Sequence, residues 1–307
     1  MSAQETRHVF ELILPAIQRL PGSAVTLTPE NAKSAQPWDP DGIAPTEKPS
    51  AIAIPAPGNT PGCFPVKVDG NFDGREGWDG WNGIRNRPML VMLDGRSLGT
   101  VRAMYDAKNL YLGYTVWHPA GPANSGSELP YSPFVSGAYV DFSIAPDWSQ
   151  PQRREVKEGD MRVIVARVSN GAAGVESNFQ QGFWQKKVGG SNPQTISSPA
   201  ATVHFDQITT VPGLQIGYKV NPKDQRSGSI QYTVKIVVPL ASLGLSDVAG
   251  KTIGFDASIG VANTAGDQRE RAAHWAGLSE GHVVDRPGST VLLPHTWGTL
   301  TFVSPAK

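Results

Sequence analysis

The chain has 307 residues, with 27 Lys and Arg against 27 Asp and Glu, so its formal net charge is zero. Because it lacks the basic excess that neutralises phosphates, it is not expected to bind nucleic acid. A single Cys excludes an internal disulfide and a thiolate zinc site. The 33 Gly and 26 Pro indicate many turns and hence a β-rich fold.

Residues 1–20 predict a short amphipathic helix that packs on a domain, with docking to a partner as the alternative. Its apolar residues share one helical face: Val9, Phe10, Ile13, Ile17 and Leu20. The segment lacks the basic start and the cleavage site of a signal peptide. No segment of the chain reaches the ~18 apolar residues that a transmembrane helix needs, so no membrane span is expected.

Residues 21–65 are rich in Pro, Ala, Gly, Thr and Asn and predict an extended connector. A strand is conceivable at 51–54. Pro55 and Pro57 would confine that strand to a sheet edge, because proline cannot donate to a neighbouring strand.

The pattern changes at residue 66, and residues 66–307 predict one antiparallel β domain. Runs at 102–105 and 110–116 flank the polar turn 106–109 and predict a hairpin. Further strands are predicted at 137–144, 161–168, 202–210, 214–220, 230–238, 252–261 and 297–303. Residues 240–245 predict one helical turn.

Residues 69–74 match the opening of a calcium-binding EF-hand loop, with oxygen side chains at alternate positions and Gly at the sixth. The twelfth position is Gly80, where an EF-hand needs a bidentate Glu, so that motif is not supported. An Asx-rich turn is the simpler interpretation. A different calcium site through Asp69, Asn71 and Asp73 stays open.

Most tryptophans lie in Gly-, Pro- and Asn-rich contexts: Trp78, Trp81, Trp117, Trp148, Trp184 and Trp275. Aromatic faces at such positions can stack on the apolar faces of sugar rings, although burial in the core is the alternative for each of them. Trp297 lies in a predicted strand and is expected in the core. Trp78 and Trp81 are expected to cap the domain.

Catalytic motifs are weak. No Gly-x-Ser-x-Gly elbow and no His-x-x-x-His pair occur. A glycoside hydrolase needs two facing carboxylates, and no rule of spacing pairs Asp141 or Asp256 with another acid. The prediction therefore leans away from an enzyme, with hydrolysis kept as an alternative. His274, beside Trp275, can bond a sugar hydroxyl or a local backbone group.

Five short motifs follow one another between residues 66 and 303: Val68–Asp73 with Trp78, Tyr105–Leu112, Ala138–Asp141, Tyr232–Leu245, and Gly254–Asp256 with Trp297–Leu300. In this order they resemble the motifs of family-nine-like carbohydrate-binding modules, within the superfamily that includes the DOMON haem and sugar domains. Ala138 and Lys235 stand where the family pattern has acids. The resemblance implies an immunoglobulin-like, jelly-roll-like β-sandwich, a sugar clamped by aromatic side chains, structural calcium and an extracellular or periplasmic location. It is also compatible with the chain being one part of a longer protein.

The residues and the resemblance together predict a non-catalytic carbohydrate-binding module, an accessory part of a glycan-processing system whose ligand is a neutral polysaccharide or oligosaccharide. Stacking is assigned to Trp117, Trp184 and Trp275, and hydrogen bonding to Asp141, Arg269 and His274.

Two other functions remain open. A haem-binding electron-transfer domain would need axial ligands from Met104, Met161, His118 and His274, whose spacing favours no pair, so haem is not expected. A structural or adhesive module could dock another protein chain through residues 1–65.

Overall fold

The computed structural model describes residues 48–305 without 59, 128, 170–175, 190, 199–201, 223–229, 278 and 281–287. The predicted helix 1–20 and the first part of the predicted connector lie outside the described residues.

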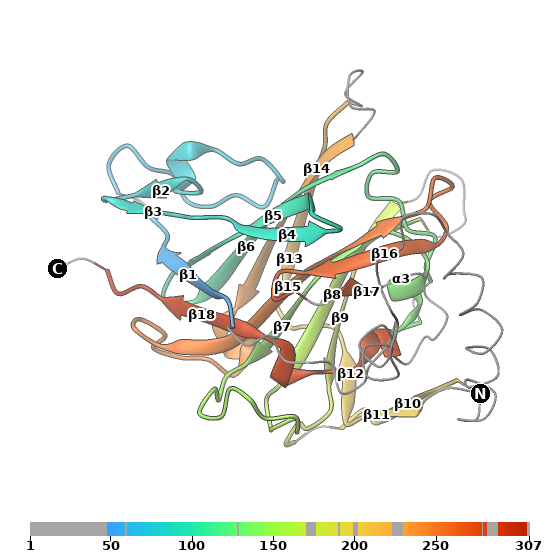
Figure 1. The fold of residues 1–307 in the computed structure, drawn as a ribbon. Helices are drawn as coiled ribbons and strands as arrows, with labels where there is room; N and C mark the ends of the chain where they lie inside the picture. The colour runs from blue at the N-terminus through green and yellow to red at the C-terminus, as the bar shows by residue number, and fades with distance from the viewer. Residues whose placement is uncertain are drawn as a thin grey trace, which may run out of the picture. The chain divides into compact units, whose positions relative to one another are not determined.

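Within the described residues, fourteen strands join in one continuous sheet that curls into two layers (Figure 1). These two layers are called the first sheet and the second sheet below. The first sheet runs in the order β4 (Met89–Leu93), β5 (Arg96–Tyr105), β6 (Asn109–His118), β14 (Ile230–Pro239) and β13 (Gln215–Val220). The second sheet runs in the order β12 (Gln207–Thr209), β9 (Glu176–Trp184), β8 (Met161–Ser169), β7 (Tyr139–Ala145) and β15 (Thr252–Ala262). On its free side β15 pairs with β18 (Gly298–Phe302) through its first half and with β16 (Arg269–His274) through its second half, and β16 pairs with β17 (Ser279–Glu280). This arrangement confirms the predicted all-β sandwich.

The main hydrophobic core lies between the two sheets and follows the alternation of the strands. In β14, for example, Tyr232, Val234, Ile236 and Val238 face this core. Intervening residues such as Lys235 point to the outer side of the first sheet, because successive side chains of a strand face opposite ways. The period-2 pattern therefore decides which side chains are available outside the sandwich.

The outer side of the second sheet is also covered. Phe134 of α3 (Ser132–Val135) packs there, as does the hairpin of β10 (Gln194–Ser197) and β11 (Thr202–Phe205). The residues around η4 (Gly288–Thr290) and η5 (Pro294–Thr296) complete the cover with Leu292 and Trp297. Both faces of β7 are consequently buried along its whole length.

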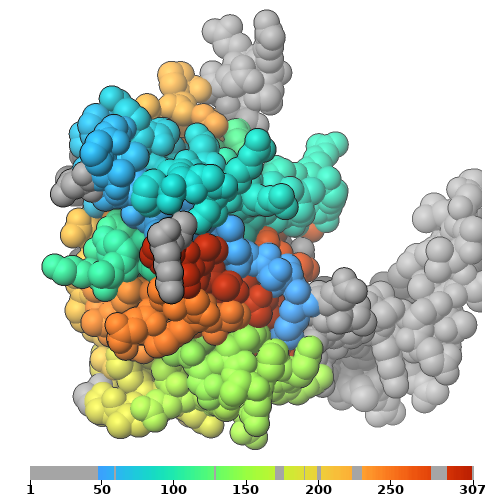
Figure 2. Space-filling view, turned by 90° about the vertical axis from the view of Figure 1, so that its left-hand side faces the viewer, coloured from blue at the N-terminus to red at the C-terminus, as the bar shows by residue number. Residues whose placement is uncertain are grey.

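The described residues cover only part of the first sheet on its outer side. Residues 66–85, here called the covering arm, include η2 (Gly74–Glu76), β2 (Gly80–Trp81) and β3 (Ile84–Arg85). The arm packs Trp78 against Met104 and Tyr111, which confirms the capping role predicted for this tryptophan. In Figure 2 the residues between β1 and β4, in blue and cyan, form the upper part of the face that is shown.

Strand β1 (Ser50–Pro55) corrects two expectations. It lies inside the predicted connector, and it is not an edge strand, because it runs parallel to both β18 and β5. Its first half pairs with β18 and its second half with β5, and Ala53 alone pairs with both. Pro55 therefore pairs with β5 only. Proline tolerates this position, because it has no N–H group to donate to a strand on its other side. The sandwich includes β1 and begins earlier than residue 66.

Local predictions hold at several turns. In the β5–β6 hairpin, Asp106 Oδ1 accepts bonds from the backbone N–H groups of Lys108 and Asn109, both at 2.7 Å, as in an Asx turn. The predicted helical turn after β14 is η3 (Leu240–Leu243). None of the helices among the described residues is long and apolar enough to cross a membrane.

Candidate functional site

Trp117 presents its ring on the outer side of the first sheet. It lies near the end of β6, where Val116 and Tyr114 face the core, and its side chain is 38 % exposed. Gln231 lies directly opposite on β14. The Asn221 backbone N–H donates to the Gln231 carbonyl oxygen at 2.8 Å, and Asn221 Nδ2 donates to Gln231 Oε1 at 2.7 Å. The Trp117 ring therefore lies beside the Gln231 amide, and a hydrogen bond to the Asn221 amide fixes the orientation of both amides.

The other two predicted stacking residues face protein. Trp184 is 2 % exposed and belongs to the main core, with the Lys187 ammonium 3.9 Å from the centre of its ring. Trp275 is half-buried and packs on Phe255, with ring centres 6.3 Å apart. The three tryptophans lie in three different places, and among them Trp117 has the ring most open to solvent.

Two of the predicted hydrogen-bonding residues share one row of the second sheet. Ser258 of β15 lies opposite Asp141 of β7 on one side and opposite His274 of β16 on the other. Directly opposite residues of antiparallel strands place their side chains on the same face, so the three side chains point to the outer side of this sheet. All three are buried there beneath the cover.

The acids of this region are bound to internal partners. Asp141 Oδ2 accepts bonds from Arg162 Nε at 3.0 Å and from Arg162 Nη2 at 2.5 Å. Asp256 Oδ2 lies 2.7 Å from His274 Nδ1. Such pairing is what buried charges require. Ser258, beside His274 and Asp256, has the chemistry of a nucleophile, but its side chain is completely buried, so no substrate reaches its hydroxyl.

Arg269 belongs to the same buried region. It lies at the start of β16, where its Nη1 donates to the Tyr139 hydroxyl at 2.9 Å and its Nη2 to Ser289 Oγ at 3.1 Å. The structure thus brings Asp141, Arg269 and His274 together on the outer side of the second sheet. Trp117 lies on the opposite side of the sandwich, so the six predicted ligand-binding residues do not form one site.

The three candidate calcium ligands each have a local partner. Asp69 Oδ1 accepts from the Asn71 backbone N–H at 2.9 Å, and Asn71 Oδ1 accepts from Lys219 Nζ at 2.7 Å. Asp73 accepts from the side chain and backbone of Arg75, which hold the pKa of this carboxyl below its usual value. The backbone contacts of Asp69 and Asp73 form Asx turns, whereas Asn71 is bonded to a side chain of β13. Across the described residues no cluster of three or more His, Cys, Asp or Glu side chains suits a metal ion.

Lys235, which stands where the family pattern has an acid, is completely buried under the covering arm. Its ammonium donates to Glu76 Oε2 at 2.5 Å, to the Lys67 carbonyl oxygen at 3.1 Å and to Asp69 Oδ1 at 3.3 Å. Trp78 Nε1 also donates to Glu76 Oε2, at 2.8 Å. The positively charged Lys235 ammonium is therefore surrounded by oxygen atoms of the covering arm. Sequence reasoning missed Glu76, whose position in a short polar turn gives no sign of burial.

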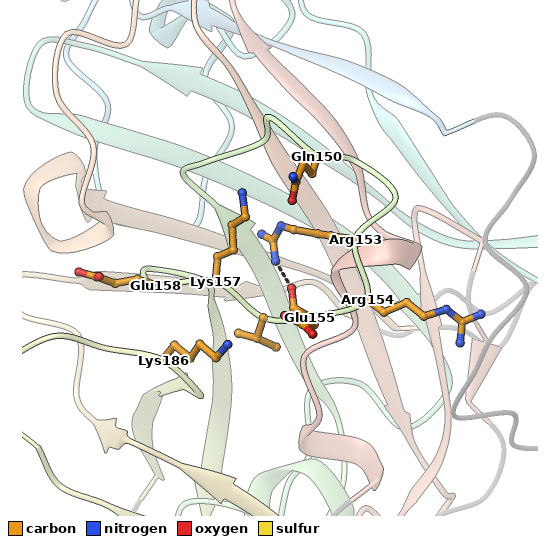
Figure 3. Close-up of a pocket in the computed structure, with 8 residues that line it drawn as sticks. Gln150, Arg153, Arg154, Glu155, Lys157, Glu158 and Lys186 are labelled. Carbon is orange, nitrogen blue, oxygen red and sulfur yellow. Dashed lines mark hydrogen bonds between the residues drawn. The ribbon is translucent and has the colours of Figure 1, made fainter.

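A pocket of about 430 Å³ lies beneath the loop between β7 and β8 (Figure 3). One of its two arginines is already neutralised, because Arg153 bonds both carboxylate oxygens of Asp160, at 2.5 and 2.6 Å, and the carbonyl oxygen of Glu155. Lys157 is paired with Asp147 at 2.8 Å. None of the predicted site residues lines this pocket, whose lining consists of Gln150, Arg153, Arg154, Glu155, Val156, Lys157, Glu158 and Lys186.

The residues considered for haem ligation are spread over the sandwich. Met161 lies in the main core, whereas Met104 packs against the covering arm on the outer side of the first sheet. His118 ends β6, where burial lowers the pKa of its imidazole and nearby Glu270 partly opposes that shift. His274 is bonded to Asp256.

The strand arrangement resembles that of solved carbohydrate-binding modules. A carbohydrate binding module of family 9 from Caldicellulosiruptor kristjanssonii, in complex with cellotriose, is 12 % identical over 84 % of this chain and 96 % of that chain, with a TM-score of 0.49. A family 9 module from the same organism, in complex with glucose, is 13 % identical over 83 % and 97 %, with a TM-score of 0.46. No family model matches the sequence, and no curated protein matches it. The likeness concerns the fold.

Proposed function

We propose that this chain is a non-catalytic carbohydrate-binding module that binds a neutral glycan on the outer side of the first sheet. The observation that carries the proposal is the exposed ring of Trp117 beside the mutually bonded amides of Gln231 and Asn221. The order of family-nine-like motifs along the sequence supports the same function.

The chemistry of this surface suits a sugar. A ring face covers the apolar C–H face of a pyranose, while amide groups offer both donors and acceptors to hydroxyl groups. Because Asn221 holds the Gln231 amide in place, less side-chain freedom is lost on binding. The zero net charge of the chain also favours a neutral ligand over a polyanion.

In this proposal the remaining predicted residues are structural. Trp184 and Trp275 pack against the main core. Beneath the cover of the second sheet, Asp141 is bonded to Arg162, Arg269 to Tyr139, and His274 to Asp256. An extracellular or periplasmic role, accessory to glycan processing, follows from the family resemblance and belongs to the same proposal.

The test is affinity electrophoresis against a panel of neutral soluble polysaccharides, followed by calorimetry with the glycan that retards the protein most. Trp117→Ala should weaken binding by about 30-fold, as expected for a central aromatic contact. The matched control is Val188→Ala, another exposed apolar residue, after β9, which should bind like the wild type. Equal binding by Trp117→Ala and wild type, or a wild type that binds no glycan of the panel, would refute the proposal.

A further inference from the structure

The strand register gives the outward positions of the whole first sheet. One row of them runs through β4, β5, β6, β14 and β13, and its members are Leu90, Thr100, Thr115, Thr233 and Lys219. Thr115 and Thr233 of this row are buried, whereas Leu90 and Lys219 at its two ends are exposed. Beyond this row, Met92 lies opposite Ser97 at one side of the sheet, and Trp117, Gln231 and Asn221 follow one another at the other side. The pairing of β5 with β6 ends between them, at Gly99 and Val116, and together these five residues form the second row. We call the two rows the platform. Five strands at the usual ~4.8 Å spacing span roughly 19 Å, which is longer than one sugar ring.

A β-bulge between β4 and β5 brings Ser97 opposite Met92 on the outer side. Val91 lies opposite Gly99, but Met92 lies opposite Ser97, so Leu98 has no partner on β4. Leu98 turns into the main core, whereas Ser97 and Met92 remain exposed on the outer side. A regular ladder would have placed Leu98 on the platform, so the extra residue changes which side chain a ligand meets.

One side of the platform is bounded and the other is open. Thr233 Oγ1 donates to the Gly70 carbonyl oxygen at 2.5 Å, and Lys219 Nζ is bonded to Asn71, so the covering arm lies over this end of the first row. Gly70 has φ +75°, and a Cβ there would strike the backbone of Tyr218, so only glycine allows this approach. The β4 end is open, since Leu90 is 52 % and Met92 is 41 % exposed.

The side chains of the platform alternate in character. Apolar surfaces come from Leu90, Met92 and Trp117, while hydroxyl and amide groups come from Thr100, Ser97, Gln231 and Asn221. An extended neutral glycan has the same alternation of C–H faces and hydroxyl edges, repeated along its length. Exposed leucine and methionine side chains in line with an exposed tryptophan form a surface that a ligand can cover.

Resting on the proposed function, we infer that the ligand lies across the strands as a run of several sugar units, from Asn221 past Trp117 to Leu90 and Met92. The site then recognises the interior of a neutral polysaccharide chain instead of a chain end. Trp117 supplies one subsite, and β4 supplies a second subsite two strands away.

The experiment is calorimetry with cello-oligosaccharides and xylo-oligosaccharides of increasing length, and with the same sugars reduced at their terminal unit. Affinity should rise with each unit until the platform is filled, and reduction of the chain end should leave it unchanged. The double variant Leu90→Ser/Met92→Ser should lose about tenfold in affinity for the long sugars, because it removes apolar area that the ligand covers. It should leave the affinity for the shortest bound sugar unchanged.

The matched control is Leu129→Ser, an equally exposed leucine in the loop before α3, which should bind like the wild type. Affinity that stops rising after one or two units, loss of binding on end reduction, or a double variant that equals wild type would overturn the inference. If Trp117→Ala still weakens binding in those cases, the proposed function survives. A wild type that binds neither series would overturn the inference as well, and the polysaccharide panel then decides the proposed function separately.

Discussion

The outer sides of the two sheets carry similar residue types and use them differently. On the second sheet, Asp141, Asp256 and Arg269 are covered, and each has a partner inside the protein. On the first sheet, the covering arm stops short of Trp117 and Gln231, which keep contact with solvent. Availability to a ligand is therefore decided by the cover and not by the kind of residue. Substitutions of covered, paired residues should therefore lower stability, whereas substitutions of exposed residues such as Trp117 should change ligand binding.

The largest effect is expected on the covered side. Asp141→Ala leaves the buried Arg162 guanidinium without its carboxylate and should lower the free energy of unfolding by about 4 kcal/mol. Urea denaturation measures this loss. The control is Asp147→Ala, whose exposed ion pair with Lys157 should contribute less than about 1 kcal/mol. Comparable losses for both variants would contradict the importance assigned to the cover.

On the first sheet, Lys235→Met should lower the free energy of unfolding by about 3 kcal/mol, because Glu76 then keeps a buried negative charge without its cation. The double variant Lys235→Met/Glu76→Gln should recover part of that loss. A single variant as stable as the wild type would show that the ammonium does not hold the covering arm.

The same ammonium bears on calcium. Since Lys235 already supplies a cation to Glu76 and Asp69, a chelator should leave the melting temperature of the wild type unchanged. Differential scanning calorimetry with and without EDTA measures this. A clear fall in the melting temperature would instead support a calcium ion among the described acids.

A small pH-dependent effect is expected at His118, next to Trp117. Burial lowers the pKa of His118 in the folded state, so between that value and its ordinary value near 6.5 the unfolded state binds more protons. Stability should therefore rise as the pH rises through this window, and His118→Gln should flatten the rise. Chemical denaturation between pH 5 and pH 8 tests the sign, and a steeper rise in the variant would contradict it.

Local signals in the sequence predicted much of the sandwich. The polar turn at Asp106, the alternation of β14 and the helical turn after it all lie where the pattern placed them, because each depends on neighbouring residues. Strand β9 was missed, since its polar residues hide the alternation, and so was β16, whose Arg-Glu-Arg-Ala-Ala run resembles a helix. Those two strands form because neighbouring strands pair with them.

The candidate site was predicted only in part. The sequence pattern placed Trp117, Trp184 and Trp275 in one group, but the ring of Trp117 is exposed whereas that of Trp184 is buried. The alternation of residues along a strand predicts which side chains share a face. It does not predict whether another segment covers that face. Strand β1 shows the same limit, because its two partners lie far away in the chain.

The sequence by itself determined the fold class, the main hairpin, several turns and the two faces of regular strands such as β14, because propensity and alternation act over a few residues. Only the tertiary structure decided which of those residues a ligand can reach. That depends on the covering arm folding over one half of the first sheet and on distant loops closing over the second. It also decided that Lys235 finds Glu76 more than a hundred positions away. Burial and charge pairing of this kind arise from contacts that no local pattern specifies.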